Sequence, residues 1–151
     1  MSFGPGPLSQ ALAGIVGVNA VLFLAQLFTD RYDWGLTWTL GLHPADVVGA
    51  LSVWQLATYM FLHGSMFHIL FNMLALWMFG TELERIWGTR YFLKFYFVTG
   101  IGAGVLTVLV SLLPFRFAAE LGQSIVIGAS GAIYGLLLAY ALRSEEHTSE
   151  L

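Results

Sequence analysis

The sequence predicts an all-α protein, a polytopic bundle of transmembrane helices with about four membrane spans. Of its 151 residues, 58% are hydrophobic and only 10% are charged, whereas roughly 25% of the residues of a soluble domain carry charge. Several apolar stretches approach the ~20 residues that a helix needs to cross the hydrocarbon core of a bilayer. We therefore expect an integral membrane protein that is surrounded by lipid.

The first expected span covers residues 11–28 and follows an uncharged start. Because the start lacks the basic region of a secretory signal, we expect an uncleaved helix. A polar stretch, 29–44, and a moderately apolar stretch, 45–62, come next. The second of these holds Trp54 and Tyr59, and such residues favour the membrane interface. This region is therefore expected to be a long loop with short helices that lie partly in the membrane.

Three further spans follow the long loop. Span two runs over 66–80 and is expected to end at the polar segment 81–90. Span three covers 91–113, because Pro114 marks its end, and span four covers 127–142. Small residues that let helices approach closely in lipid are frequent on the last two spans; they are Gly100, Gly102, Gly104, Gly128, Gly131 and Gly135.

Charge placement predicts the orientation, since Lys and Arg near short loops favour the cytoplasmic side. Arg85, Arg90 and Lys94 lie between spans two and three, and Arg143 follows span four, while the opposite side carries Arg31 and Arg116. The N-terminus is therefore expected in the cytoplasm and the long first loop outside. The short N-terminus without an organelle-targeting segment favours a bacterial inner membrane.

A potential nucleophile lies where span four begins. Ser130 sits in the run Gly128-Ala129-Ser130-Gly131, and Tyr134 follows one helical turn later on the same face. His68 and Asn72 are spaced i, i+4 on span two, which puts an imidazole and a carboxamide on a single helix face. Three groups able to do acyl-transfer chemistry are thus expected at similar depth in the membrane.

Each of these features also has a structural interpretation. A lone serine in a membrane helix usually bonds the carbonyl one turn back, and the pair Gly131 and Gly135 is typical of a packing face. His68 and Asn72 could equally join helices, although polar groups are costly at this depth. His43 and His63 lie in or beside the first loop, where a solvated or interfacial histidine is expected.

The chain resembles the rhomboid intramembrane serine proteases. The resemblance rests on the loop sequence 54–63 (WQLATYMFLH), on His68-Ile69-Leu70-Phe71-Asn72, on Gly80 with Glu82 and Glu84, and on Gly128-Ala129-Ser130-Gly131 with Tyr134-Gly135. It covers most of residues 11–142.

The resemblance implies a serine-type endopeptidase that cleaves transmembrane segments of other membrane proteins through an acyl-enzyme. Ser130 would be the nucleophile, and its backbone N–H would form the oxyanion hole with the side chains of His68 and Asn72. Gly128 and Gly131 would allow the tight backbone around the serine, and Tyr134 would pack against the general base. The resemblance implies neither a metal nor an organic cofactor.

Two departures from the family pattern stand out. The family commonly has Trp-Arg where this chain has Trp54-Gln55, which is expected to loosen a loop contact. The family's general-base histidine lies on a sixth span that this chain does not contain, and His147 lies in a polar run on the opposite side of the membrane. We therefore interpret residues 1–143 as a partial rhomboid-like membrane domain, with about four spans of an expected six-span core. Residues 144–151 form a polar tail that we interpret as non-native.

Other functions remain as alternatives. An inactive rhomboid-like protein that binds transmembrane clients would be expected to lack catalytic residues, yet Ser130, His68 and Asn72 are present. A small transporter or channel subunit would need paired ionisable groups along a pore, and the spans hold almost none beyond His68. The formal net charge of -3 comes without a basic cluster, which argues against nucleic acid as a partner. No cysteine is present, so a thiol nucleophile and a thiolate metal site are excluded.

Overall fold

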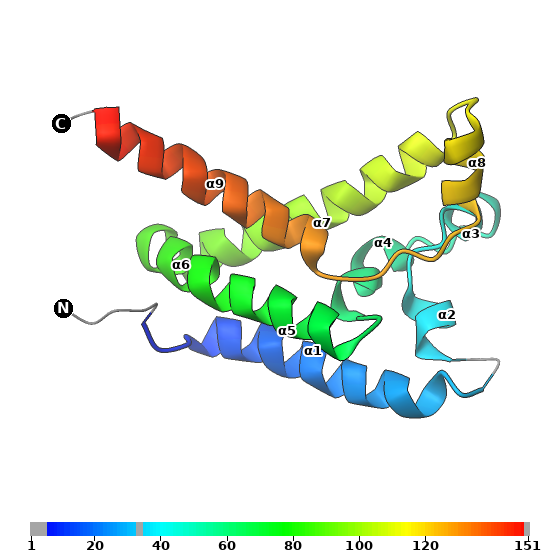
Figure 1. Ribbon diagram of the computed structural model, residues 1–151, viewed down its shortest axis with the longest axis horizontal. Coiled ribbons are helices and arrows are strands. Elements are labelled where there is room, and N and C mark those ends of the chain that lie inside the picture. Colours follow the sequence, from blue (N-terminus) through cyan, green and yellow to red (C-terminus); the bar gives the residue numbers. More distant parts are fainter. Residues whose placement is uncertain (1–5, 33–34, 150–151) are drawn as a thin grey trace.

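Three long helices dominate the computed structural model, which describes residues 6–32 and 35–149 and the side chains as far as Arg143 (Figure 1). They are α1 (Gln10–Thr29), a continuous helix over Met66–Trp87, and α7 (Thr89–Ser111). Each is long and apolar enough to cross a membrane. The described part of the chain contains helices and no strand. The prediction of an all-α, polytopic integral membrane protein is therefore confirmed.

The second long helix extends further than the sequence predicted. It consists of α5 (Met66–Ala75), the π-helical segment η2 (Leu76–Gly80) and α6 (Thr81–Trp87), so the polar segment expected to end it is largely helical. The helix ends at Gly88, whose φ of 78° suits a residue without a side chain. The prediction that residue 81 ends the helix was wrong, because polar residues continue a helix readily once it leaves the apolar layer.

The fourth expected span corresponds to α9 (Ser130–Ser149). This helix starts three residues later than predicted, and its backbone continues as a helix beyond Arg143. Its apolar part, 130–142, is roughly 20 Å long at 1.5 Å per residue, which is shorter than the hydrocarbon core. Among the described residues, only α1, the helix over Met66–Trp87 and α7 meet the length and hydropathy of a span.

Short helices fill the connections at one end of the bundle. The first loop contains α2 (Leu36–Leu40), α3 (Pro44–Gly49), α4 (Gln55–Thr58) and the 3₁₀ turn η1 (Tyr59–Phe61), and this confirms the prediction of a long loop with short helices. The connection between α7 and α9 contains α8 (Arg116–Gly122), which the sequence analysis did not anticipate. In Figure 1 these elements gather opposite α6 and the end of α9.

Helix starts and a buried carboxylate fix the arrangement of the long helices. The hydroxyl of Ser9 caps α1 by accepting the N–H of Leu12 at 3.1 Å. The same hydroxyl donates to Glu84 Oε2, and Thr89 Oγ1 donates to Glu84 Oε1 at 2.6 Å. Glu84 is only 6% exposed, so one carboxylate links the start of α1, α6 and the start of α7.

Helix α9 packs closely on α7. A Cβ placed on Gly131 would lie 2.7 Å from the Cβ of Ala103, and one on Gly135 would lie 2.8 Å from the Cβ of Thr99. Both distances are too short for real side chains, so these glycines allow the two backbones to approach. Gly102 was predicted to pack as well, but a Cβ there would meet no atom within 4 Å because it lies on the outer face of α7.

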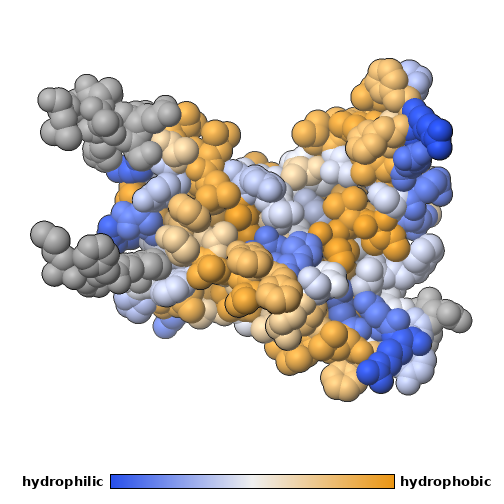
Figure 2. All heavy atoms as spheres, viewed as in Figure 1, coloured by the Kyte–Doolittle hydropathy of each residue, from blue (hydrophilic) through white to orange (hydrophobic). Residues whose placement is uncertain are grey.

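The surface follows the pattern of a membrane protein. Figure 2 shows hydrophobic side chains over much of the face that α1, α5 and α9 present, with hydrophilic side chains towards the ends of the molecule. A smaller hydrophilic area lies at the beginning of α5. Exposed apolar side chains on the helices, such as Val21, Leu70 and Leu106, are the ones expected to face lipid.

Candidate active site

The segment that leads into α9 is held by the first loop. Val126 forms a reciprocal backbone pair with Leu42, with N···O distances of 2.8 and 2.9 Å. The N–H of Gly128 donates to the carbonyl of Tyr59 at 2.9 Å. Gly128 has a φ of 122°, in a region that residues with a side chain rarely adopt. The backbone therefore takes a conformation that favours glycine two residues before Ser130.

Helix α5 brings its imidazole and carboxamide against this segment. A Cβ placed on Gly128 would lie 2.7 Å from Nε2 of His68 and 3.7 Å from Nδ2 of Asn72. Both side chains therefore approach the backbone two residues before Ser130. The structure thus brings His68 and Asn72 of α5 together with Gly128, which lies in the segment before α9 and is far from them in the sequence.

The hydrogen bonds of His68 indicate which ring nitrogen carries the proton. The hydroxyl of Ser65 caps α5 by accepting the N–H of His68 at 3.1 Å, and this fixes the first helical turn. The N–H of Gly64 donates to Nδ1 of His68 at 3.3 Å. Because a neutral imidazole has one donor and one acceptor, the proton is assigned to Nε2. His68 therefore presents an N–H donor towards Gly128.

Asn72 is buried at 8% exposure, and its Nδ2 has no hydrogen-bond partner among the described residues. An unpaired buried donor costs about 1–3 kcal/mol. Such a group in a native structure usually has a specific reason to remain. This unpaired Nδ2 lies beside Gly128, in the segment that leads to Ser130.

The nucleophile candidate itself begins α9. Ser130 is partly exposed, between the buried Ala129 and the partly buried Gly131, and its backbone N–H belongs to the first turn of the helix. Tyr134 lies one turn further along α9 and is 71% exposed. Gly131 faces α7 and also lies near the hydroxyl of Tyr59, 3.2 Å from a Cβ placed on the glycine. Gly131 therefore shapes the contact between α7 and α9.

His63 was expected to be solvated or interfacial, and this prediction was wrong. Its side chain is 2% exposed, because the loop between η1 and α5 folds inward and packs its ring edge-on against His68, with 4.9 Å between the ring centroids. Its backbone N–H donates to Oε1 of Gln26 on α1 at 3.0 Å. Burial, followed by the neighbouring His68, lowers the pKa of His63 to about 4, so this imidazole is neutral at physiological pH.

His43 is also buried, at 9% exposure, because the first loop folds against α8. Its backbone N–H donates to Oε1 of Gln55 at 3.0 Å. The buried amide of Gln55 therefore joins two parts of the loop, while the expectation that it loosens a contact relative to arginine at this position stays a prediction. Tyr59 was missed as a site residue; apart from holding Gly128, it donates its hydroxyl proton to the carbonyl of Gly100 at 2.7 Å.

The long apolar helices and the polar groups that meet between α5 and α9 define a polytopic integral membrane protein with a buried polar site. Residues 50–151, more than half of the chain, match the Rhomboid domain family. The chain therefore belongs to the rhomboid family.

Several curated proteins are similar over shorter lengths. Rhomboid-like protein 15 of Arabidopsis thaliana is 31% identical over 130 residues, which is 83% of this chain and 32% of that protein. RHOMBOID-like protein 4 of the same plant is 35% identical over 97 residues, 64% of this chain and 22% of the relative. Rhomboid protease GluP of Bacillus subtilis (strain 168) is 39% identical over 84 residues, 56% of this chain and 14% of the relative. The chain thus spans less than a third of the length of each of these relatives.

Proposed function

We propose that the protein is an intramembrane serine endopeptidase that cleaves transmembrane segments of membrane proteins, with Ser130 as its nucleophile. The convergence of His68 Nε2 and Asn72 Nδ2 on Gly128, two residues before the serine, carries this proposal. The similarity to a protein that is named as a protease, Rhomboid protease GluP, also supports it.

In the proposed reaction, the hydroxyl of Ser130 attacks the carbonyl carbon of the scissile peptide bond. The carbonyl oxygen of the substrate then becomes an oxyanion. The N–H of His68 Nε2, the amide of Asn72 and the backbone N–H of Ser130 donate to this oxyanion. One such preorganised donor stabilises a transition state by about 2.7–4 kcal/mol. The amine leaves with a proton, an acyl-enzyme remains, and water hydrolyses it.

A base must remove the proton of Ser130. The printed sequence has four histidines. His63 is neutral but buried against His68, and His68 already accepts from Gly64 through Nδ1. Nε2 of His43 lies against the carbonyl oxygen of Gln123, so none of these three histidines suits the role. We therefore propose that the base lies on a segment beyond residues 1–143, the part that we interpret as a partial rhomboid-like domain, and that residues 144–151 are not part of the natural protein.

The substrate class follows from the location of the site. Ser130 begins a helix whose outer face is apolar, and α5 beside it exposes Phe67 and Phe71, so a substrate can reach the site from the lipid. We propose transmembrane proteins as substrates. From charge placement we propose a cytoplasmic N-terminus. A bacterial inner membrane also stays a proposal, and the similar proteins come from a plant and from a bacterium.

The test is a cleavage assay in proteoliposomes with the product of the native locus and a transmembrane substrate. Cleavage that Ser130→Ala abolishes supports the proposal, and cleavage that survives this substitution contradicts it. For the 151-residue chain as printed, we expect no cleavage above the Ser130→Ala level, because losing one member of a catalytic unit costs on the order of 10⁶ in turnover in a serine protease.

Sequencing the locus downstream of codon 143 separates this function from its alternative. Two further apolar spans, the second with a histidine among small residues, would complete the proposed peptidase. A stop codon at 152 would leave a nucleophile without a base. That result would favour an inactive rhomboid-like protein that binds transmembrane clients.

A further inference from the structure

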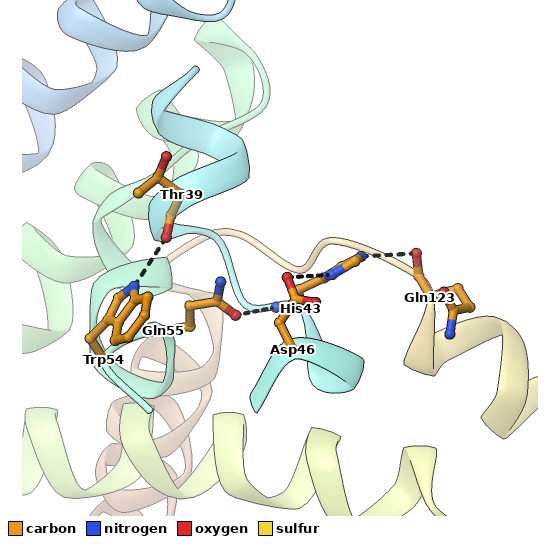
Figure 3. Close-up of polar contacts among 6 residues, drawn as sticks. All are labelled: Thr39, His43, Asp46, Trp54, Gln55 and Gln123. Atoms are coloured by element: carbon orange, nitrogen blue, oxygen red, sulfur yellow. Dashed lines mark hydrogen bonds and ion pairs between the residues drawn. The ribbon is translucent and has the colours of Figure 1, made fainter. Parts of the chain in front are cut away.

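The first loop holds the segment before Ser130 at its beginning, its middle and its end. At the end of the segment, the N–H of Gly128 donates to the carbonyl of Tyr59. In the middle, Val126 forms its backbone pair with Leu42. At the beginning, Nε2 of His43 lies 3.3 Å from the carbonyl oxygen of Gln123 (Figure 3). Gln123 is also the C-cap residue that directly follows α8. The contact of His43 therefore fixes the point at which the chain leaves α8 towards the site.

His43 is itself held in place by its own loop. Its backbone N–H donates to the buried amide oxygen of Gln55, and Nδ1 lies 3.0 Å from Oδ2 of Asp46 on α3, as an ion-pair contact without the direction of a good hydrogen bond. The ring of Trp38 packs beside it, with 5.2 Å between the ring centroids. Figure 3 shows the imidazole lying between the Asp46 carboxylate and the Gln123 carbonyl. The ring is thus aimed at Gln123 by several contacts.

The chemistry of the contact requires a donor on Nε2. A carbonyl oxygen can only accept, so the ring must present N–H towards Gln123. Leucine would fill the same space without a donor, and asparagine is too short to reach. Glutamine places an amide N–H at about the distance of Nε2 from the backbone. The role of His43 can therefore be separated from the general packing of the loop.

We propose that His43 is a positioning residue of the active site. Through Gln123 it sets the position of residues 123–128, and hence the distance between Gly128 and the donors His68 and Asn72. A role of His43 in catalysis rests on the proposed function. Its effect on the position of residues 123–128 does not depend on catalysis. His43 touches neither the serine nor the oxyanion donors.

Hydrogen–deuterium exchange of the 151-residue chain in nanodiscs tests the proposal without any turnover. The variants are His43→Leu, His43→Asn and His43→Gln. Trp54→Phe is the matched control, because it removes a different hydrogen bond of the same loop, from Trp54 Nε1 to the carbonyl of Thr39 at 3.1 Å. Exchange is compared between peptides covering residues 123–130 and peptides from α1 and α6.

We expect amides of residues 123–130 to exchange about five-fold faster in His43→Leu and His43→Asn, which corresponds to the ~1 kcal/mol of one hydrogen bond. His43→Gln and Trp54→Phe should keep the rate of the unmodified chain, and peptides from α1 and α6 should not change in any variant. If His43→Leu does not fold, the proposal is tested by the difference in the exchange rate of residues 123–130 between His43→Asn and His43→Gln.

Equal exchange in the asparagine and glutamine variants would overturn the proposal. So would a rise that extends to α1 and α6 in both of them, since His43 would then support the fold in general. A cleavage assay that fails while the exchange result holds would contradict the proposed function alone.

Discussion

Replacing Gly128 with alanine should destabilise the backbone that leads to Ser130. The φ of 122° at this position is strained for a residue with a side chain, at a cost of about 1–3 kcal/mol. The added Cβ would also lie 2.7 Å from Nε2 and 2.8 Å from Cε1 of His68. Overpacking of this kind costs typically 1–3 kcal/mol. Together we expect Gly128→Ala to lower the free energy of unfolding by about 2–6 kcal/mol.

Gly102→Ala is the matched control, because a Cβ there meets no atom within 4 Å and the residue lies inside a helix. Its expected effect is less than about 1 kcal/mol, in the stabilising direction, from helix propensity. The assay is SDS-induced unfolding of both variants in mixed micelles, followed by circular dichroism. Equal unfolding midpoints for the two variants would refute the conformation and the contact assigned to Gly128.

The remaining predictions concern three buried polar groups. Asn72→Leu should leave the midpoint of SDS unfolding unchanged or raise it. The buried Nδ2 that it removes has no partner among the described residues, and such a donor costs about 1–3 kcal/mol. If the free energy of unfolding instead falls by more than that amount, the amide has a partner. Glu84→Ala should destabilise the fold by about 2–4 kcal/mol, because it removes the acceptor of the Ser9 and Thr89 hydroxyls, and Glu84→Gln should recover part of this loss in the same titration. The pKa of His63 is lowered to about 4 in the folded chain, below its unfolded value of about 6.5. As the pH falls from about 6.5 towards 4, the unfolded chain binds a proton at this histidine before the folded chain does. The free energy of unfolding therefore decreases, by up to about 3 kcal/mol. Thermal unfolding at pH 7 and pH 4.5 should show this loss, His63→Gln should reduce it, and an identical loss in that variant would refute the assignment.

The helices were predictable from the sequence because they depend on local composition. Apolar runs of sufficient length gave α1, α7 and the core of the second long helix, and the spacing of His68 and Asn72 placed them on one face. The exact ends were less predictable. Residues 81–87 include four polar side chains but are helical, because a helix that leaves the membrane does not need an apolar sequence to continue.

The contacts that shape the candidate site depend on residues far apart in the sequence. The pair of Leu42 with Val126, the bond from Gly128 to Tyr59 and the approach of His43 to Gln123 join two loops. No periodicity in either loop predicts them, and the bond from His43 to Gln55 could not be read from the sequence either. The roles of Ser130 and its neighbours came from the family resemblance, because the spacing of the residues offers no reaction by itself.

Fluorophosphonate labelling of the 151-residue chain tests most directly whether Ser130 is a nucleophile beside an oxyanion hole. Added imidazole takes the place of the base that we propose on a segment beyond residue 143. The measurement is the imidazole-dependent rate of labelling, with the modified residue identified by mass spectrometry. We expect labelling at Ser130, none in Ser130→Ala, and a rate lower by about 10²–10³ in Asn72→Ala, the loss typical of one oxyanion donor. Labelling at the same rate in Asn72→Ala, or at another residue in Ser130→Ala, would contradict the proposed active site.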